Sequence, residues 1–140
     1  MKKYNRYIFR GKRVDNGEWV EGFLSKSRGE NKQLELCIDH EEKGVMCSSI
    51  VIPKTVGQCT GLEDKNGKLI FEGDIIKTKK YGRDIGHSNV NDFDIFKVIY
   101  EPAVFRLENV RRGFNLVGNG NDFEVIGNVM DNSELLEVEE

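Results

Sequence analysis

The stretch from Pro53 to Lys77, PKTVGQCTGLEDKNGKLIFEGDIIK, constrains the fold more than any other part of this chain. It follows an apolar run that ends at a proline, and it alternates short apolar segments with turn residues. Asn66-Gly67 supplies the positive φ angles of a tight hairpin. Gly73-Asp74 predicts a bend, because glycine adopts backbone geometry closed to other residues and aspartate bonds the N–H groups of a turn. The stretch therefore predicts strands joined by tight turns, and it lacks the layout of an active site.

The same alternation of strands and turns runs through the whole chain of 140 residues, which has 15 glycines and few helix signals. Asn16-Gly17 predicts an N-terminal hairpin, residues 25–31 read as a loop, and Ser133 to Leu136 predict one helical turn capped by Asn132 or Ser133. The expected strands cover residues 7–11, 19–24, 33–39, 45–52, 69–71, 75–78, 94–100, 103–107, 114–117 and 123–130, and residues 53–62 are expected to form an extended connection with one further strand.

Strands at this close spacing favour an all-β fold with little helix. We place a boundary at Pro53, which cannot donate to a strand ladder. The expected organisation is an N-terminal β-hairpin or sheet subdomain over residues 1–53 and a small SH3/OB-like β-barrel over residues 54–140, which ends in the short helical turn.

Composition limits the expected cellular compartment and the expected classes of binding partner. The net charge of −3 lacks the basic surplus of a strong polyanion binder. Three cysteines without a CxxC pair favour a reducing compartment and positions in the core or in strands, over a metal site. No apolar run approaches the roughly 20 residues of a membrane helix, so a soluble, cytoplasmic protein is expected. We expect no cofactor and no metal.

Four acidic residues lie close together in sequence: Glu63, Asp64, Glu72 and Asp74. One interpretation is a cation site or an acid–base pair in a metal-dependent enzyme. A calcium loop, however, needs regularly spaced oxygen ligands on one loop, and here a strand separates the two acidic pairs. The favoured interpretation is that Asp64 shapes the hairpin turn and that Asp74 caps the next turn.

A basic stretch begins the longest expected loop, at residues 79–92, and three further arginines would add to it if the barrel brings them near. Its cations and its aromatic ring suit a nucleic-acid contact, with phosphates bound by the cations and a base stacked on the ring; small barrels host such sites on their strand faces. A solvated loop is the alternative. The candidate residues are Lys79, Lys80, Tyr81, Arg83, Arg106, Arg111 and Arg112.

The remaining candidates are two histidines and an aromatic pair. His40 and His87 have no visible nucleophile nearby in sequence, so both are interpreted as surface residues and no catalytic residue is assigned. Trp19 and Phe23 share one face of the first hairpin by their even spacing. We expect Trp19 to pack in the core, and an exposed patch at this hairpin would serve self-association.

The order of motifs closely resembles the YopX family of small bacteriophage and prophage proteins over nearly the whole chain. YIFRGKR…GEWVEG comes first, then TVGQ, TGL, DKNG and FEGD, and finally EVIGN followed by ELL. Cys59 stands where the family more often has an aromatic residue. The resemblance implies a β-rich fold with a small barrel and no assigned enzymatic activity. Its motif residues, expected to be structural, are Gly57, Gly61, Asp64, Asn66, Gly67, Glu72, Gly73, Asp74 and Gly127.

Three functional hypotheses follow. The first is a phage- or prophage-encoded, non-enzymatic interaction module that associates with itself as a homo-oligomer or with a phage or host protein. The second is a nucleic-acid-binding accessory protein that uses the basic loop. The third and weakest is a metal-dependent enzyme at the acidic group.

Overall fold

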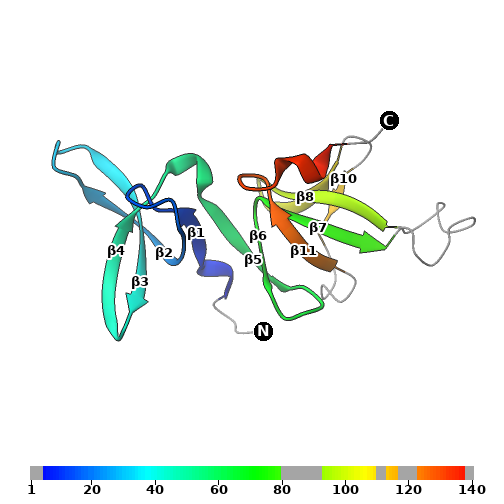
Figure 1. Ribbon diagram of the computed structural model, residues 1–140, viewed down its shortest axis with the longest axis horizontal. Helices are drawn as coiled ribbons and strands as arrows, with labels where there is room; N and C mark the ends of the chain where they lie inside the picture. Colours follow the sequence, from blue (N-terminus) through cyan, green and yellow to red (C-terminus); the bar gives the residue numbers. More distant parts are fainter. Residues whose placement is uncertain (1–4, 80–92, 110–112, 117–122, 138–140) are drawn as a thin grey trace, which may run out of the picture. The chain divides into compact units, whose positions relative to one another are not determined.

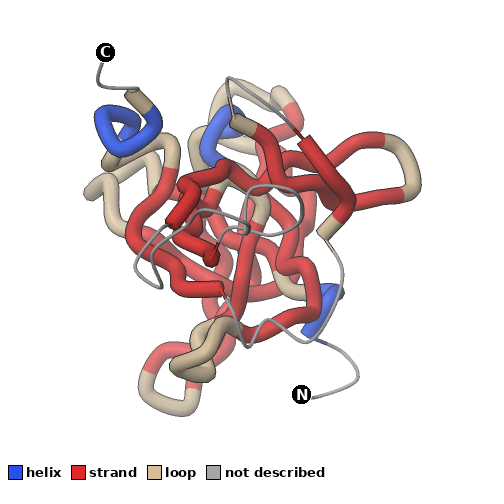
Figure 2. The backbone as a smooth tube through the Cα atoms, turned by 90° about the vertical axis from the view of Figure 1, so that its right-hand side faces the viewer, coloured by secondary structure: helices blue, strands red, loops and turns tan. Residues whose placement is uncertain are grey.

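The computed structural model describes residues 5–79, 93–109, 113–116 and 123–137. Strands dominate these residues and only three short 3-10 turns accompany them (Figure 1, Figure 2), so the predicted all-β class is confirmed. The chain divides into two compact units, Met1–Gly61 and Leu62–Glu140. The division lies beyond Pro53, inside strand β5 (Gly57–Glu63), because the start of β5 still pairs with a strand of the first unit. None of the described helices is long and apolar enough to cross a membrane.

The first unit contains most of an antiparallel sheet. It contributes β1 (Phe9–Lys12), β2 (Trp19–Arg28), β3 (Leu34–Glu42), β4 (Val45–Ile50) and the start of β5. The order in the sheet is β4-β3-β2-β1-β5-β6, and β6 (Leu69–Phe71) belongs by sequence to the second unit. Two 3-10 turns, η1 (Asn5–Tyr7) and η2 (Pro53–Thr55), complete the unit. The predicted β1–β2 hairpin is confirmed: Gly17 has a φ of 71°, and the N–H of Glu18 donates to Asn16 Oδ1 at 3.0 Å.

Strand β2 is longer than the sequence predicts. The polar residues from Ser25 to Arg28 were expected in a loop, but they continue the ladder and lie opposite residues Cys37 to Leu34 of β3. Their composition is typical of a loop, yet pairing with strand β3 satisfies their backbone groups and outweighs that local preference.

The second unit holds a five-stranded antiparallel sheet of order β10-β9-β8-β7-β11. The strands are β7 (Asp74–Lys79), β8 (Phe93–Glu101), β9 (Val104–Glu108), β10 (Gly113–Asn115) and β11 (Phe123–Asn128). Among the described strands the sheet stays open, which corrects the expected closed barrel. Closure would need a ladder between β10 and β11, and the three residues of β10 pair with β9.

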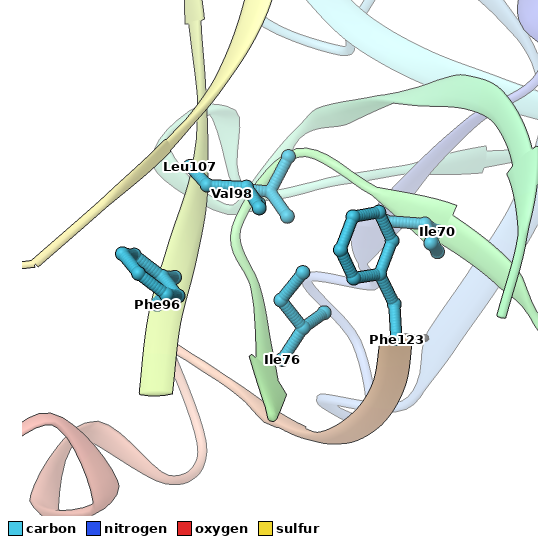
Figure 3. Close-up of a cluster of buried hydrophobic side chains, with 6 residues drawn as sticks. All are labelled: Ile70, Ile76, Phe96, Val98, Leu107 and Phe123. Atoms are coloured by element: carbon cyan, nitrogen blue, oxygen red, sulfur yellow. The ribbon is translucent and has the colours of Figure 1, made fainter. Parts of the chain in front are cut away.

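One apolar cluster forms the core of the second unit. Ile76 lies opposite Phe96, and Val98 lies opposite Leu107, so alternate residues of β7, β8 and β9 reach the same face of the sheet. Figure 3 shows these side chains with the others of the cluster, which are all nearly or fully buried: Ile70, Ile76, Phe96, Val98, Leu107 and Phe123. Burial of this apolar surface is the main stabilising contribution to the unit.

Asp64 organises the second predicted hairpin turn. Its Oδ1 accepts the N–H groups of Asn66 and Lys68, both at 2.9 Å, and its Oδ2 accepts the N–H of Val125 at 3.0 Å. Burial by itself raises the pKa of this carboxyl, but the three backbone donors favour the charged form and the pKa is lowered overall. The interpretation of Asp64 as a turn residue is confirmed.

Asp74 has the corresponding role at the next turn, as predicted. It is only 1% exposed, and its Oδ2 accepts the N–H of Phe71 at 2.8 Å. Gly73, with a φ of 88°, and Gly67, with a φ of 80°, adopt the left-handed backbone that these two turns require. Gly61 has the same kind of backbone, with a φ of 85°.

The C-terminal helical turn η4 (Ser133–Leu136) is confirmed, but its cap differs from the prediction. The side chain of Asn132 makes no cap bond; instead its Oδ1 accepts the N–H of Asn128 at 3.2 Å. The register of β11 against β7 is irregular between Val125 and Gly127. A Cβ on Gly127 would lie 2.6 Å from Asn132 Oδ1, so glycine is needed there for the close approach of Asn132.

Candidate interaction surface

One face of the β2–β3–β4 sheet carries apolar and acidic side chains together. Phe23 lies opposite Asp39, and Glu41 lies opposite Met46, which places them on the same side of the sheet because alternate residues share a side. We call the set of Glu21, Phe23, Asp39, Glu41 and Met46 the Phe23 face. These residues line an open hollow together with Ile8, Gly22 and His40. Phe23 is 53% exposed, which agrees with an exposed patch at this hairpin, one of the two alternatives that the sequence left open.

Asp39 is held in its charged form at the centre of the Phe23 face. The hydroxyl of Ser48 donates to Asp39 Oδ1 at 2.5 Å and the hydroxyl of Ser25 donates to the same oxygen at 2.9 Å. These two bonds, that of Ser48 above all, lower the pKa of the carboxyl. The hollow therefore combines a fixed negative charge with two exposed apolar side chains.

Gly22 brings β2 unusually close to β3 at the hollow. A Cβ at this position would lie 2.0 Å from the carbonyl oxygen of Asp39 and 3.1 Å from the side chain of Ile38. Only glycine fits such an approach. The sequence marks Gly22 as one of many glycines, and nothing local distinguishes it.

His40 is buried at 8% exposure, so its interpretation as a surface histidine was wrong. Its Nε2 lies 2.7 Å from Ser49 Oγ, and its Nδ1 lies 3.7 Å from Glu42 Oε1. Glu42 in turn pairs with Arg13 at 3.3 Å. The order of serine, histidine and carboxylate resembles a catalytic relay, but Ser49 is also only 8% exposed. The network joins β3 to β4 through a satisfied buried imidazole. The partners lie on two different strands, and for this reason the sequence did not reveal them.

Two cations contact the ring of Trp19. The guanidinium carbon of Arg10 is 4.8 Å from the centre of the indole ring, and Lys12 Nζ is 5.4 Å from it. We expected Trp19 to pack in the core, but it is only half-buried. It packs on its own hairpin instead. The cation contacts stabilise the β1–β2 hairpin by roughly 0.5–1 kcal/mol each.

Strand β4 is the outer strand of the first sheet, and it carries no charged residue. Val45 is 63% exposed and Met46 is 65% exposed. Natural edge strands usually have charges or prolines that prevent pairing with another chain. The apolar, uncharged edge of β4 is therefore the second notable feature of the first unit.

The cysteines lie in strands, as predicted. Cys37 in β3 and Cys59 in β5 are buried, Cys47 in β4 is partly exposed, and all three are free. In the part of the chain that the structure describes, no three His, Cys, Asp or Glu side chains are grouped as metal ligands.

The predicted nucleic-acid group falls largely outside the described residues, which omit Lys80, Tyr81, Arg83, Arg111, Arg112 and also His87. Lys79 ends strand β7 opposite Phe93. Arg106 lies in β9, where its Nε is 3.9 Å from Glu101 Oε2. A nucleic-acid contact by this group stays a prediction.

Comparisons with known proteins agree with the fold. A crystal structure of protein EF1440 from Enterococcus faecalis is similar with a TM-score of 0.54 and 22% identity, over 92% of this chain and 96% of that one. A crystal structure of protein YopX from Bacillus subtilis is similar with a TM-score of 0.53 and 19% identity, over 96% of this chain and 99% of that one. No curated protein matches the chain. Residues 8–137 match the family described as YopX protein, and the chain therefore belongs to the YopX family.

Proposed function

We propose that this protein is a non-enzymatic interaction module, encoded by a phage or prophage, that works in the bacterial cytoplasm and associates with a second copy of itself. The observation that carries the proposal is the outer strand β4, whose exposed Val45 and Met46 lie on an edge without charge. Exposed apolar side chains on an unguarded edge favour pairing with another chain.

The burial of His40 and Ser49 supports a non-enzymatic function of the protein. Both residues are 8% exposed, which leaves a substrate little access to the hydroxyl. His40 Nε2 already contacts Ser49 Oγ, and Nδ1 faces Glu42, so the network stabilises the β3–β4 pairing. We infer that the function of the first unit lies in its surface.

Sedimentation velocity over a wide range of protein concentration tests self-association. The wild-type chain is expected to shift from monomer to dimer as the concentration rises. Val45→Lys and Met46→Lys place a charge on the β4 edge and are expected to shift the transition to higher concentration. Leu34→Lys is the matched control, because Leu34 is also exposed, at 61%, but lies on β3 opposite Arg28 and away from β4.

A wild-type chain that remains monomeric at every concentration would reject self-association. An equal effect of Leu34→Lys and Met46→Lys would show that association does not use β4. In the first case the chain would need a partner of another kind. In the second case it would associate through a surface other than β4.

A further inference from the structure

Several backbone N–H and C=O groups of β4 point away from β3. The N–H of Val51 donates to the carbonyl of Leu36 at 3.0 Å, and the β3–β4 register places Cys37 opposite Ile50. Hydrogen-bonded and non-hydrogen-bonded pairs alternate in an antiparallel ladder. The backbone groups of Val45, Cys47 and Ser49 therefore point toward β3, whereas those of residues 46, 48 and 50 point outward.

The outward direction at Ile50 is confirmed independently, because its carbonyl accepts the N–H of Val14 at 2.9 Å. This bond occupies one end of the outer edge. Among the described residues, no strand pairs with the edge at Met46 and Ser48. Each of these two residues has one outward N–H and one outward C=O.

We propose that two copies of the chain pair β4 with β4, antiparallel, with Met46 opposite Ser48 of the partner subunit and Cys47 opposite the partner's Cys47. This inference rests on the self-association proposed above, and it specifies which residues of the two β4 strands lie opposite each other. In this register Met46 and Ser48 each exchange both backbone bonds with the partner, and the two-fold axis passes beside Cys47. The interface is self-complementary, as a symmetric dimer requires.

The neighbouring registers fit less well. Pairing Met46 with the partner's Met46 would place Gly44 opposite Ser48, but Gly44 lies in the β3–β4 turn with a φ of 80°. Pairing Ser48 with the partner's Ser48 would require the carbonyl of Ile50, which already accepts from Val14. Only the register centred on Cys47 uses two residues whose outward groups are both available.

The pairing covers Val45 and Met46, and it brings no charges together because β4 has none. One short strand buries less than the roughly 1,200 Å² of a standard interface. The dimer is therefore expected to dissociate at low concentration, with a Kd of about 1 μM or weaker.

Cys47 makes the register measurable. Residues opposite each other in a non-hydrogen-bonded pair have Cα atoms about 4.5 Å apart, within the range of about 4.4–6.8 Å that a disulfide spans. The other two cysteines are 1% and 0% exposed, so they do not compete for an oxidant. Oxidised glutathione accepts the two electrons and two protons as two Cys47 thiols become one disulfide.

The test is the formation of covalent dimer by the full chain under oxidised glutathione, followed on non-reducing gels. Wild type is expected to form a disulfide dimer that reducing agent reverses, and Cys47→Ser is expected to form none. The matched variant Met46→Cys in the Cys47→Ser background moves the thiol by one residue, out of register with its own copy. This variant is expected to cross-link roughly tenfold more slowly, because the two thiols at position 46 do not lie opposite each other and the effective concentration of one thiol near the other is lower.

Equal cross-linking from positions 46 and 47, or none from Cys47, would overturn the register. Sedimentation of Cys47→Ser without oxidant separates this outcome from failure of the proposed function. A reversible dimer of Cys47→Ser together with no disulfide in the wild type would reject the register and keep self-association. A monomer at all concentrations would reject both.

Discussion

Asp64 Oδ2 accepts the N–H of Val125 at 3.0 Å, although 61 residues separate the two in the chain. The same carboxylate holds its own turn through Asn66 and Lys68. One side chain therefore connects a local hairpin to β11, the strand that pairs with β7 near the end of the chain. The Asp64 turn therefore also fixes tertiary structure.

We expect Asp64→Asn to lower the free energy of unfolding by about 2 kcal/mol, because hydrogen bonds to a charged acceptor contribute roughly 1.5–3 kcal/mol each and the amide cannot accept at both atoms. Urea denaturation measures the change. Glu124→Gln is the matched acid-to-amide control: Glu124 is partly exposed and pairs with Lys65 at 3.2 Å, a surface pair worth less than about 1 kcal/mol. Equal effects of the two substitutions would contradict a special role of Asp64.

The contribution of Asp64 should also depend on pH. Its pKa is lowered in the folded chain, so its stabilisation is present above the unfolded pKa of about 3.9 and is lost as the pH falls through the folded value. The difference in unfolding free energy between wild type and Asp64→Asn should be constant from neutral pH to about pH 5 and should shrink below about pH 4. Urea denaturation of both chains at several pH values measures this difference. A difference in unfolding free energy that increases as the pH falls would contradict the lowered pKa of Asp64.

Gly22→Ala should destabilise the first unit by about 3 kcal/mol or more, because its Cβ would lie 2.0 Å from the carbonyl oxygen of Asp39 and the two strands would have to separate. Gly17→Ala is the control: Gly17 has a φ of 71° but open space around it, so only backbone strain of about 1–2 kcal/mol is expected. Thermal unfolding followed by the fluorescence of Trp19 compares the two. A larger loss for Gly17→Ala would be inconsistent with close approach at Gly22.

Phe23→Ser should lower the stability of the monomer by only about 1 kcal/mol, because the side chain is 53% exposed and full burial of a Phe side chain contributes roughly 1.5–3 kcal/mol. Ile70→Ala, at a fully buried position, should cost about 2–5 kcal/mol. Urea denaturation at low protein concentration measures both without a contribution from the dimer. A large loss for Phe23→Ser would mean that the Phe23 face serves folding rather than recognition.

The turns of this fold are predictable from sequence because their determinants are local. Asn16-Gly17 and the Asp64 turn were both expected, and in each an Asn or Asp side chain bonds an N–H group within a few residues. The all-β class follows from the same spacing of turns and apolar runs. The C-terminal end of β2 was predicted wrongly, because pairing with β3 and not the polar sequence of β2 determines how far the ladder extends.

The candidate surface was less predictable because it depends on topology. The strand at Val45 was expected, but its position at the edge of the sheet follows from the order β4-β3-β2, which no local pattern specifies. His40 was misplaced for the same reason: its contact with Ser49 joins two strands. The open second sheet likewise reflects which strands pair, not how many strands exist.

The bond between Val14 and Ile50 has a consequence for aggregation. The uncharged, proline-free segment VMCSSI has the length and composition of sequences that stack into amyloid fibrils. Fibril growth needs a strand that accepts neighbours along its whole length on both sides. Here β3 occupies one side, and Val14 occupies the end of the other, so among the described residues only Met46 and Ser48 keep outward backbone groups without a strand beside them. In the folded chain, the hydrogen bond from Val14 therefore shortens the part of this edge on which another strand could add.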